Sequence, residues 1–205
     1  MFSLSRSKPS RLTLACRRLT IGVSLAAIGL MPSASNAQSW YGTLVGSNEV
    51  LPNTSPATGF VFMSLSGNAL SLSLNWSGLI GGPVSAGHIH CCVAPGANVG
   101  IAVGLIGLPA STSGSLSNTF DLGSLSVYTG AFVTNFGGGT VAGAQAALVA
   151  GLNSGRAYVN LHNANFPGGE IRANMVVTPE PASMVMLAFG LVAVGAGVRR
   201  KRRIS

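Results

Sequence analysis

Residues 69–77 alternate between apolar and small polar side chains along their whole length. The apolar positions are Leu70, Leu72, Leu74 and Trp76, and serine or asparagine stands between them. Because successive side chains of a β-strand point to opposite faces, this pattern predicts a strand that is buried on one face and solvated on the other. Strands of this kind are typical of antiparallel sheets.

Other segments between residues 40 and 177 show the same alternation over shorter lengths, separated by turn residues. About seven or eight such strands predict an all-β fold, and we expect an antiparallel immunoglobulin-like β-sandwich. Residues 125–133 are among the predicted strands. Residues 141–152 are rich in alanine and leucine, so they predict one short crossover helix.

The formal net charge of +8 is carried almost entirely by the two ends of the chain. Residues 1–37 contain five basic side chains, and residues 199–203 contain five more. Between residues 38 and 177 the only basic residues are Arg156 and Arg172, against three acidic residues. This middle segment is nearly neutral and has no basic patch for phosphates, which excludes nucleic acid as a partner.

Residues 1–37 have the organisation of a signal peptide. A basic region ends at Arg18, an apolar stretch covers residues 19–30, and small residues precede Ala37. We therefore expect residues 1–37 to direct the chain to the Sec export machinery, with cleavage after Ala37. An uncleaved N-terminal anchor is the alternative.

Residues 182–198 contain no charged side chain, and the basic residues 199–203 follow them. These 17 residues would span ~25 Å as a helix, which is at the short end for crossing a bilayer. Basic residues beside a spanning helix stay on the cytoplasmic side. We therefore predict a transmembrane helix over residues 182–198 that enters the inner membrane.

The motif Pro179-Glu180-Pro181 stands directly before this apolar segment. The motif, the apolar span and the arginine-rich end together resemble the PEP-CTERM sorting signal, here residues 178–205. The resemblance implies processing by an exosortase near the motif, with release or attachment outside the cell. Such proteins accompany exopolysaccharide and biofilm production, so exopolysaccharide is an implied partner. A permanent C-terminal anchor is the alternative.

The chain has only three histidines, and they lie in two segments that are far apart in the sequence. His88 and His90 flank Ile89, so strand geometry points both imidazoles to one face. His162 ends a second predicted strand, residues 158–162. We expect the two segments to meet in space, so that the three imidazoles share a pocket.

A polar face is predicted beside His162. Asn160 lies on the same strand face, and a turn over residues 163–169 leads into a returning strand. That strand carries Glu170 and Arg172, which share a face because they are two residues apart. The pair either recognises a ligand or forms a structural ion pair with help from other charged residues.

Three motifs in this part of the chain resemble the CHRD domain, the module named after chordin. They are Glu49-Val50 with Pro52, His88-Ile89-His90, and residues 158–172 with Tyr-Val-Asn-Leu-His and Phe-Pro-Gly-Gly-Glu-Ile-Arg. The resemblance covers residues 40–177, and we place the domain at residues 38–177. Departures from the family pattern occur at Gly87, Cys91-Cys92, Leu51 and Ala173. The resemblance implies a fold and a setting rather than an activity.

His88, His90 and His162 are candidate ligands for copper or zinc, because imidazole nitrogen suits both metals. The alternative is a buried network in which the imidazoles hydrogen-bond to polar side chains or main chain. The predicted structural polar network comprises Glu49, Asn160, Glu170 and Arg172.

Cys91 and Cys92 are the only cysteines that remain once Cys16 leaves with the predicted signal peptide. An exported protein meets oxidising conditions, which favour a disulfide. We predict a vicinal disulfide between the two residues. Free thiols, intermolecular bridges and thiolate ligands beside His90 are the alternatives.

Catalytic motifs are not found in the sequence. No serine lies in a Gly-x-Ser-x-Gly elbow, and Glu49, Asp121 and Glu170 show no spacing that identifies an acid and base pair. We therefore expect a non-enzymatic structural or binding component at the cell surface or in the extracellular matrix. The alternative is a secreted protein that binds copper or zinc through the three histidines.

Overall fold

The computed structural model describes residues 38–179, 189–192 and 194. The predicted signal peptide, Glu180 and Pro181 of the sorting motif, and the basic tail at residues 199–203 lie outside these residues. Most of the transmembrane helix predicted over residues 182–198 lies outside them as well. Within the described residues, no helix is long and apolar enough to cross a membrane.

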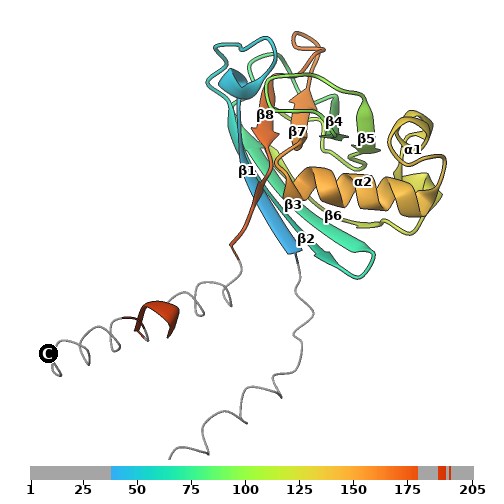
Figure 1. Cartoon of the computed structure of the whole chain (residues 1–205). Coiled ribbons are helices and arrows are strands. Elements are labelled where there is room, and N and C mark those ends of the chain that lie inside the picture. The colour runs from blue at the N-terminus through green and yellow to red at the C-terminus, as the bar shows by residue number, and fades with distance from the viewer. Residues whose placement is uncertain (1–37, 180–188, 193, 195–205) are drawn as a thin grey trace, which may run out of the picture. The chain divides into compact units, whose positions relative to one another are not determined.

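Nine strands form one sheet. They are β1 (Gln38–Val45), β2 (Thr58–Ser66), β3 (Ala69–Ser77), β4 (Ala86–Cys91), β5 (Ile101–Gly104), β6 (Gly114–Asp121), β7 (Ala157–His162), β8 (Ile171–Asn174) and β9 (Val176–Val177). The order is β5-β4-β7-β8-β1-β2-β3-β6, with β9 paired beside β1 (Figure 1). The strands pair in antiparallel fashion throughout.

Eight of the nine strands form two four-stranded halves, and β9 follows β8 and pairs with β1 as well. β5-β4-β7-β8 is one half, β1-β2-β3-β6 is the other, and β8 joins β1 through the single residue pair Val45–Arg172. Strand twist curls the sheet there, so both halves contribute side chains to one core. The predicted all-β antiparallel fold is confirmed. The predicted immunoglobulin-like sandwich is wrong, because the two halves belong to one curled sheet rather than to two sheets.

Among the described residues of the domain at 38–177, two α-helices accompany the sheet where the sequence predicted one. Helix α2 (Val141–Asn153) confirms the predicted helix, and its buried face includes Leu148 and Leu152. It begins at Thr140, whose hydroxyl accepts a hydrogen bond from the backbone N–H of Gly143 and so satisfies a free donor of the first turn.

Helix α1 (Gly130–Asn135) lies where the sequence predicted a strand. It follows a short 3-10 helix, η2 (Leu125–Val127), and Thr129 caps its N-terminus by accepting a hydrogen bond from the N–H of Phe132. A second 3-10 helix, η1 (Gly46–Asn48), follows β1. The strand predicted over residues 125–133 is therefore wrong.

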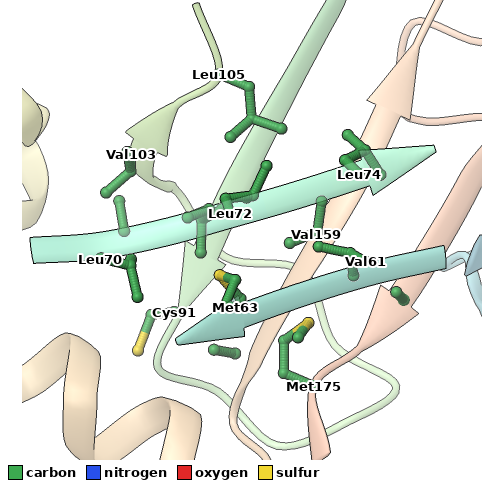
Figure 2. Close-up of a cluster of buried hydrophobic side chains, with 14 of the residues drawn as sticks. Val61, Met63, Leu70, Leu72, Leu74, Cys91, Val103, Leu105, Val159 and Met175 are labelled. Carbon is green, nitrogen blue, oxygen red and sulfur yellow. The ribbon is translucent and has the colours of Figure 1, made fainter. Parts of the chain in front are cut away.

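The core contains side chains from both halves of the sheet (Figure 2). In β3 the four apolar positions are buried and the residues between them are exposed, as the alternation predicted. Figure 2 shows Leu72 and Leu74 of β3 in the same cluster as Val103 of β5 and Val159 of β7. The described core runs from Trp40 to Met175, so residues 38–177 contain a core of their own.

Two neighbouring residues of β3 provide a test of this packing. Leu72 is 3% exposed, so Leu72→Ala should lower the free energy of unfolding by roughly 2–5 kcal/mol through lost burial and a new cavity. Ser71 points to solvent, so Ser71→Ala should change it by less than about 0.5 kcal/mol. Urea unfolding of residues 38–177 measures both values. Equal effects of the two substitutions would contradict the assigned strand faces.

Candidate metal centre

The pairing of β4 with β7 brings the two histidine segments together. His88 lies opposite Asn160, and His90 lies opposite Tyr158. His162 is opposite Ala86, at the end of the same pairing. The ring centroids are 4.9 Å apart for His88 and His162, 5.5 Å for His88 and His90, and 6.5 Å for His90 and His162. The three imidazoles therefore form one cluster on the face of these strands that points away from the core.

One nitrogen of each ring can serve as a metal ligand, and these three nitrogens lie within 4.8 Å of one another. Tetrahedral zinc with Zn–N distances of ~2.0–2.1 Å holds its ligand nitrogens roughly 3.3 Å apart. The spacing of the three nitrogens is thus wider than in a closed zinc site, and metal binding would draw the rings closer together. The arrangement fits a metal site supplied by His88, His90 and His162.

Backbone carbonyls orient two of the rings. Nδ1 of His90 lies 2.8 Å from the carbonyl oxygen of Val99, and Nδ1 of His162 lies 2.9 Å from that of Pro167. A carbonyl oxygen only accepts hydrogen bonds, so both Nδ1 atoms carry the hydrogen. In the neutral rings this leaves a lone pair on each Nε2. Such outer hydrogen bonds fix the tautomer and the direction of metal-binding histidines.

Nε2 of His90 is buried and has no hydrogen-bond partner among the described residues. His90 is 7% exposed, so water does not readily replace the missing partner. Nε2 of His162 lies 3.1 Å from Nδ1 of His88 and 3.0 Å from Oδ1 of Asn160. Buried polar atoms are normally paired, so this nitrogen of His90 is free to accept a ligand.

The environment keeps the three imidazoles neutral. Burial, together with the neighbouring His162 and His90, lowers the pKa of His88 to about 4. Burial also lowers the pKa of His90 and the pKa of His162, although their hydrogen bonds to carbonyls oppose the shift. Only a neutral imidazole offers a lone pair to a metal, so the cluster is ready to bind at neutral pH.

A stack of three side chains supports His90. The ring of Tyr158 lies parallel to that of His90, with centroids 4.5 Å apart and an interplanar angle of 4°. The guanidinium carbon of Arg172 lies 3.3 Å from the centroid of the Tyr158 ring, which is a cation–π contact. Arg172 also donates hydrogen bonds to the carbonyl oxygen of Ala97 and to Oδ1 of Asn98. The stack thus ties β7 and β8 to the loop that orients His90.

Sequence reasoning missed Tyr158 and the loop residues Asn98 and Val99 as parts of this site. Strand periodicity places Tyr158 on the same face as Asn160 and His162, but it does not predict that the ring stacks on His90. The role of Val99 could not be predicted from its side chain, because its backbone carbonyl makes the contact.

Glu170 and Arg172 make separate contacts rather than the ion pair considered from the sequence. Glu170 is fully buried and accepts hydrogen bonds from the Ser55 hydroxyl at 2.6 Å and the backbone N–H groups of Ile80 at 2.8 Å and Gly81 at 3.1 Å. The side-chain amide of Asn163 donates another. Burial alone would raise the pKa of Glu170, but these hydrogen bonds outweigh it and lower the pKa.

Glu49 is also buried, but its environment differs from that of Glu170. It is 4% exposed, and burial raises its pKa to about 7 although Arg172 and Asn160 oppose the shift. Its Oε1 has no hydrogen-bond partner among the described residues. Gly169 has φ 123°, and a Cβ at that position would overlap Oε1 of Glu49. The second glycine of the Gly168-Gly169 turn therefore makes room for this carboxyl group.

Cys91 and Cys92 are joined by a disulfide with an S–S distance of 1.95 Å. Cys91 is buried in the core, on the face of β4 opposite to His90. The carbonyl oxygen of Ala147 in α2 lies 3.6 Å from Sγ of Cys91 and 3.4 Å from Sγ of Cys92. The disulfide therefore packs against α2, away from the histidine cluster.

The hydrogen bonds to Glu170 predict a pH-dependent contribution to stability. Glu170→Gln should lower the free energy of unfolding by about 2 kcal/mol or more at neutral pH, because bonds to a charged carboxylate are lost. The folded pKa lies below the ordinary 4.5, so this contribution is present above pH 4.5 and is lost as the pH falls through the folded value. Urea unfolding from about pH 3 to about pH 7 measures the difference in free energy of unfolding between wild type and Glu170→Gln.

The exposed acid Asp121 supplies the control, and Asp121→Asn should change stability by less than about 0.5 kcal/mol. A difference between wild type and Glu170→Gln that grew as the pH fell would contradict the assigned role of Glu170.

Two parts of the chain match known protein families. A model of the CHRD domain matches residues 41–175, and a model of the PEP-CTERM protein-sorting motif matches residues 177–203. No curated protein and no solved structure gave a significant match. The sorting motif implies export and processing by an exosortase, with sorting to the membrane or cell surface. The CHRD match covers more than half of the chain, and this protein belongs to the CHRD-domain family.

Proposed function

We propose that this protein is a non-enzymatic, exported component of the cell surface or matrix that binds copper or zinc through His88, His90 and His162. The observation that carries the proposal is the buried, unpartnered Nε2 of His90 in a cluster with two other imidazoles. A purely structural hydrogen-bond network would be expected to pair this nitrogen, because buried polar atoms are normally paired. A metal ion supplies the missing partner.

The ligand type favours these two metals. Neutral imidazole nitrogen suits zinc and copper, whereas magnesium and calcium prefer oxygen ligands. His88 and His162 are only partly buried, so an ion has access from solvent. Three protein ligands leave one tetrahedral position open for water or a further ligand.

A binding role fits the surroundings of the cluster better than catalysis. Glu170 uses its carboxylate oxygens in hydrogen bonds to Ser55, Asn163 and backbone N–H groups. Asp121 ends β6, in the other half of the sheet. Glu49 lies near Asn160 and is not one of the groups gathered around the candidate site. None of the described acids belongs to the three-histidine cluster, and we therefore propose binding rather than catalysis.

The sorting signal supports the setting of this function. Its match implies an exported protein processed by an exosortase. We place the mature CHRD domain at the cell surface or in the extracellular matrix, in an exopolysaccharide context. Residues 182–198 hold the chain in the inner membrane before processing.

Metal analysis of residues 38–177 tests the proposal. We expect one equivalent of copper or zinc per chain after loading and desalting, measured by mass spectrometry of the metal content. The variant His88→Ala/His90→Ala/His162→Ala should retain none, because all three ligands are lost. Asn118→Ala, in the other half of the sheet, is the matched control and should load as the wild type does. A wild-type domain that retained neither metal would end the proposal.

Tyr158 gives a second test, because it touches His90 without offering a ligand. Tyr158→Ala removes the stacked ring and should weaken metal binding by about 10–100-fold, the usual cost of losing an outer support of a metal ligand. Tyr158→Phe keeps the ring but removes the hydroxyl that accepts a hydrogen bond from the N–H of Val99 at 3.3 Å, so it should weaken binding less, by about threefold. Isothermal titration calorimetry gives the affinities, and circular dichroism checks that both variants fold. Equal losses in the two variants would contradict a role through stacking.

A further inference from the structure

We propose that the outer face of β1, β2, β3 and β6 binds an extended, neutral polysaccharide. The outer face is defined as the side chains of these strands that point away from the core between Ser39 and Thr119. The proposal extends the surface role given above and names a partner class for a second site. It does not depend on the histidine cluster, which lies in the other half of the sheet.

The strand register arranges the outer face in three parallel rows across four strands. The rows are Ser39-Ser64-Ser71-Thr119, Tyr41-Phe62-Ser73-Ser117 and Thr43-Phe60-Asn75-Ser115. Neighbouring strands lie ~4.7–4.9 Å apart, so each row is an evenly spaced line of side chains. Every row runs across the strands and is long enough for several sugar units.

Aromatic rings occupy the part of the outer face over β1 and β2. Tyr41 is 39% exposed, Phe60 is 41% exposed and Phe62 is 39% exposed. The rings of Tyr41 and Phe60 stack with centroids 6.3 Å apart. An exposed apolar cluster rimmed by polar residues indicates a binding surface. The C–H face of a sugar ring packs on such aromatic rings while its hydroxyl groups stay in contact with polar neighbours.

Hydroxyl groups occupy the rest of the outer face. An open depression of about 650 Å³ lies there, and Phe62, Ser71, Ser73, Ser117 and Thr119 contribute to its lining. Among the described residues, the hydroxyls of Ser71 and Thr119 hydrogen-bond each other at 3.4 Å, and Ser73 and Ser117 have no side-chain partner. Hydroxyl groups both donate and accept, which matches the hydroxyl groups of a sugar chain.

The charge of the outer face selects a neutral polymer. None of the twelve positions in the three rows carries a charged side chain, and Asp121 stands only at the end of β6. A nucleic acid, an acidic polysaccharide or an anionic membrane would need lysine or arginine here. A second copy of the chain is disfavoured too, because serine is depleted in protein interfaces. The combination of aromatic rings and neutral hydroxyls fits a neutral glycan.

Cosedimentation of residues 38–177 with phosphoric-acid-swollen cellulose tests the proposal. We expect the wild type to bind this neutral polymer and to bind calcium alginate, an acidic one, at least about tenfold more weakly. Phe60→Ala/Phe62→Ala should weaken cellulose binding at least about tenfold, the loss that corresponds to ~1.4 kcal/mol. Ser73→Asp should weaken it as well, because a carboxylate in the middle row must lose water without a partner.

Three controls make the result specific. Ile106→Ala removes an exposed apolar side chain outside the outer face and should bind as the wild type does. The triple histidine variant should also bind cellulose, so a failed metal site and a failed glycan site give different results. Thermal unfolding checks that each variant is folded.

Several outcomes would overturn the proposal. They are absence of binding to swollen cellulose, equal binding by the wild type and both outer-face variants, or preference for alginate. A dimer in gel filtration that Phe60→Ala/Phe62→Ala converts to a monomer, without any cellulose binding, would assign the outer face to a second copy instead.

Discussion

The antiparallel pairing of β4 with β7 is the contact on which the candidate metal centre depends. It joins His88 and His162, which are 74 residues apart in the sequence. A shift of one residue in this pairing would turn the imidazoles toward the core and bring Ile89 to the surface. Ile89 is fully buried, so hydrophobic burial resists that shift. The apolar side chains of these strands thereby determine where the polar ones meet.

Arg172 couples the curvature of the sheet to the position of His90. Its backbone pairs with that of Val45 where β8 meets β1, and β9 pairs with β1 farther along. Its side chain is 1% exposed and packs on Tyr158, which in turn stacks on His90. A buried charge is costly unless it is hydrogen-bonded. The guanidinium group of Arg172 donates a hydrogen bond to the backbone carbonyl of Ala97 in the loop rather than to an acidic side chain. One residue therefore contributes to the junction, the loop and the site.

Most of the correct predictions from the sequence came from the period-two alternation of apolar and polar side chains. It gave the buried face of β3 and placed His88 and His90 on one side of β4, because strand geometry alone decides both. The single sheet could not be predicted, since it depends on the pairing of β8 and β9 with β1, which are far apart in the sequence. Helix α1 was mistaken for a strand because Phe132 and Val133 favour strands, and only packing and the Thr129 cap select the helix. The carbonyl of Val99, which orients His90, could not be predicted, because every residue has a backbone carbonyl.

The core occupies one face of each half of the sheet, so ligands have only the two outward faces. These faces differ in chemistry, and the difference follows from how each is covered. Over β4 and β7, the loop around Val99 buries a few directed nitrogen atoms, which suits a small ion held by short bonds. Over β2 and β3, the outward side chains are exposed and uncharged, which suits a long polymer held by many weak contacts. Since the two proposed sites lie on different halves of the sheet, occupation of one would leave the other open.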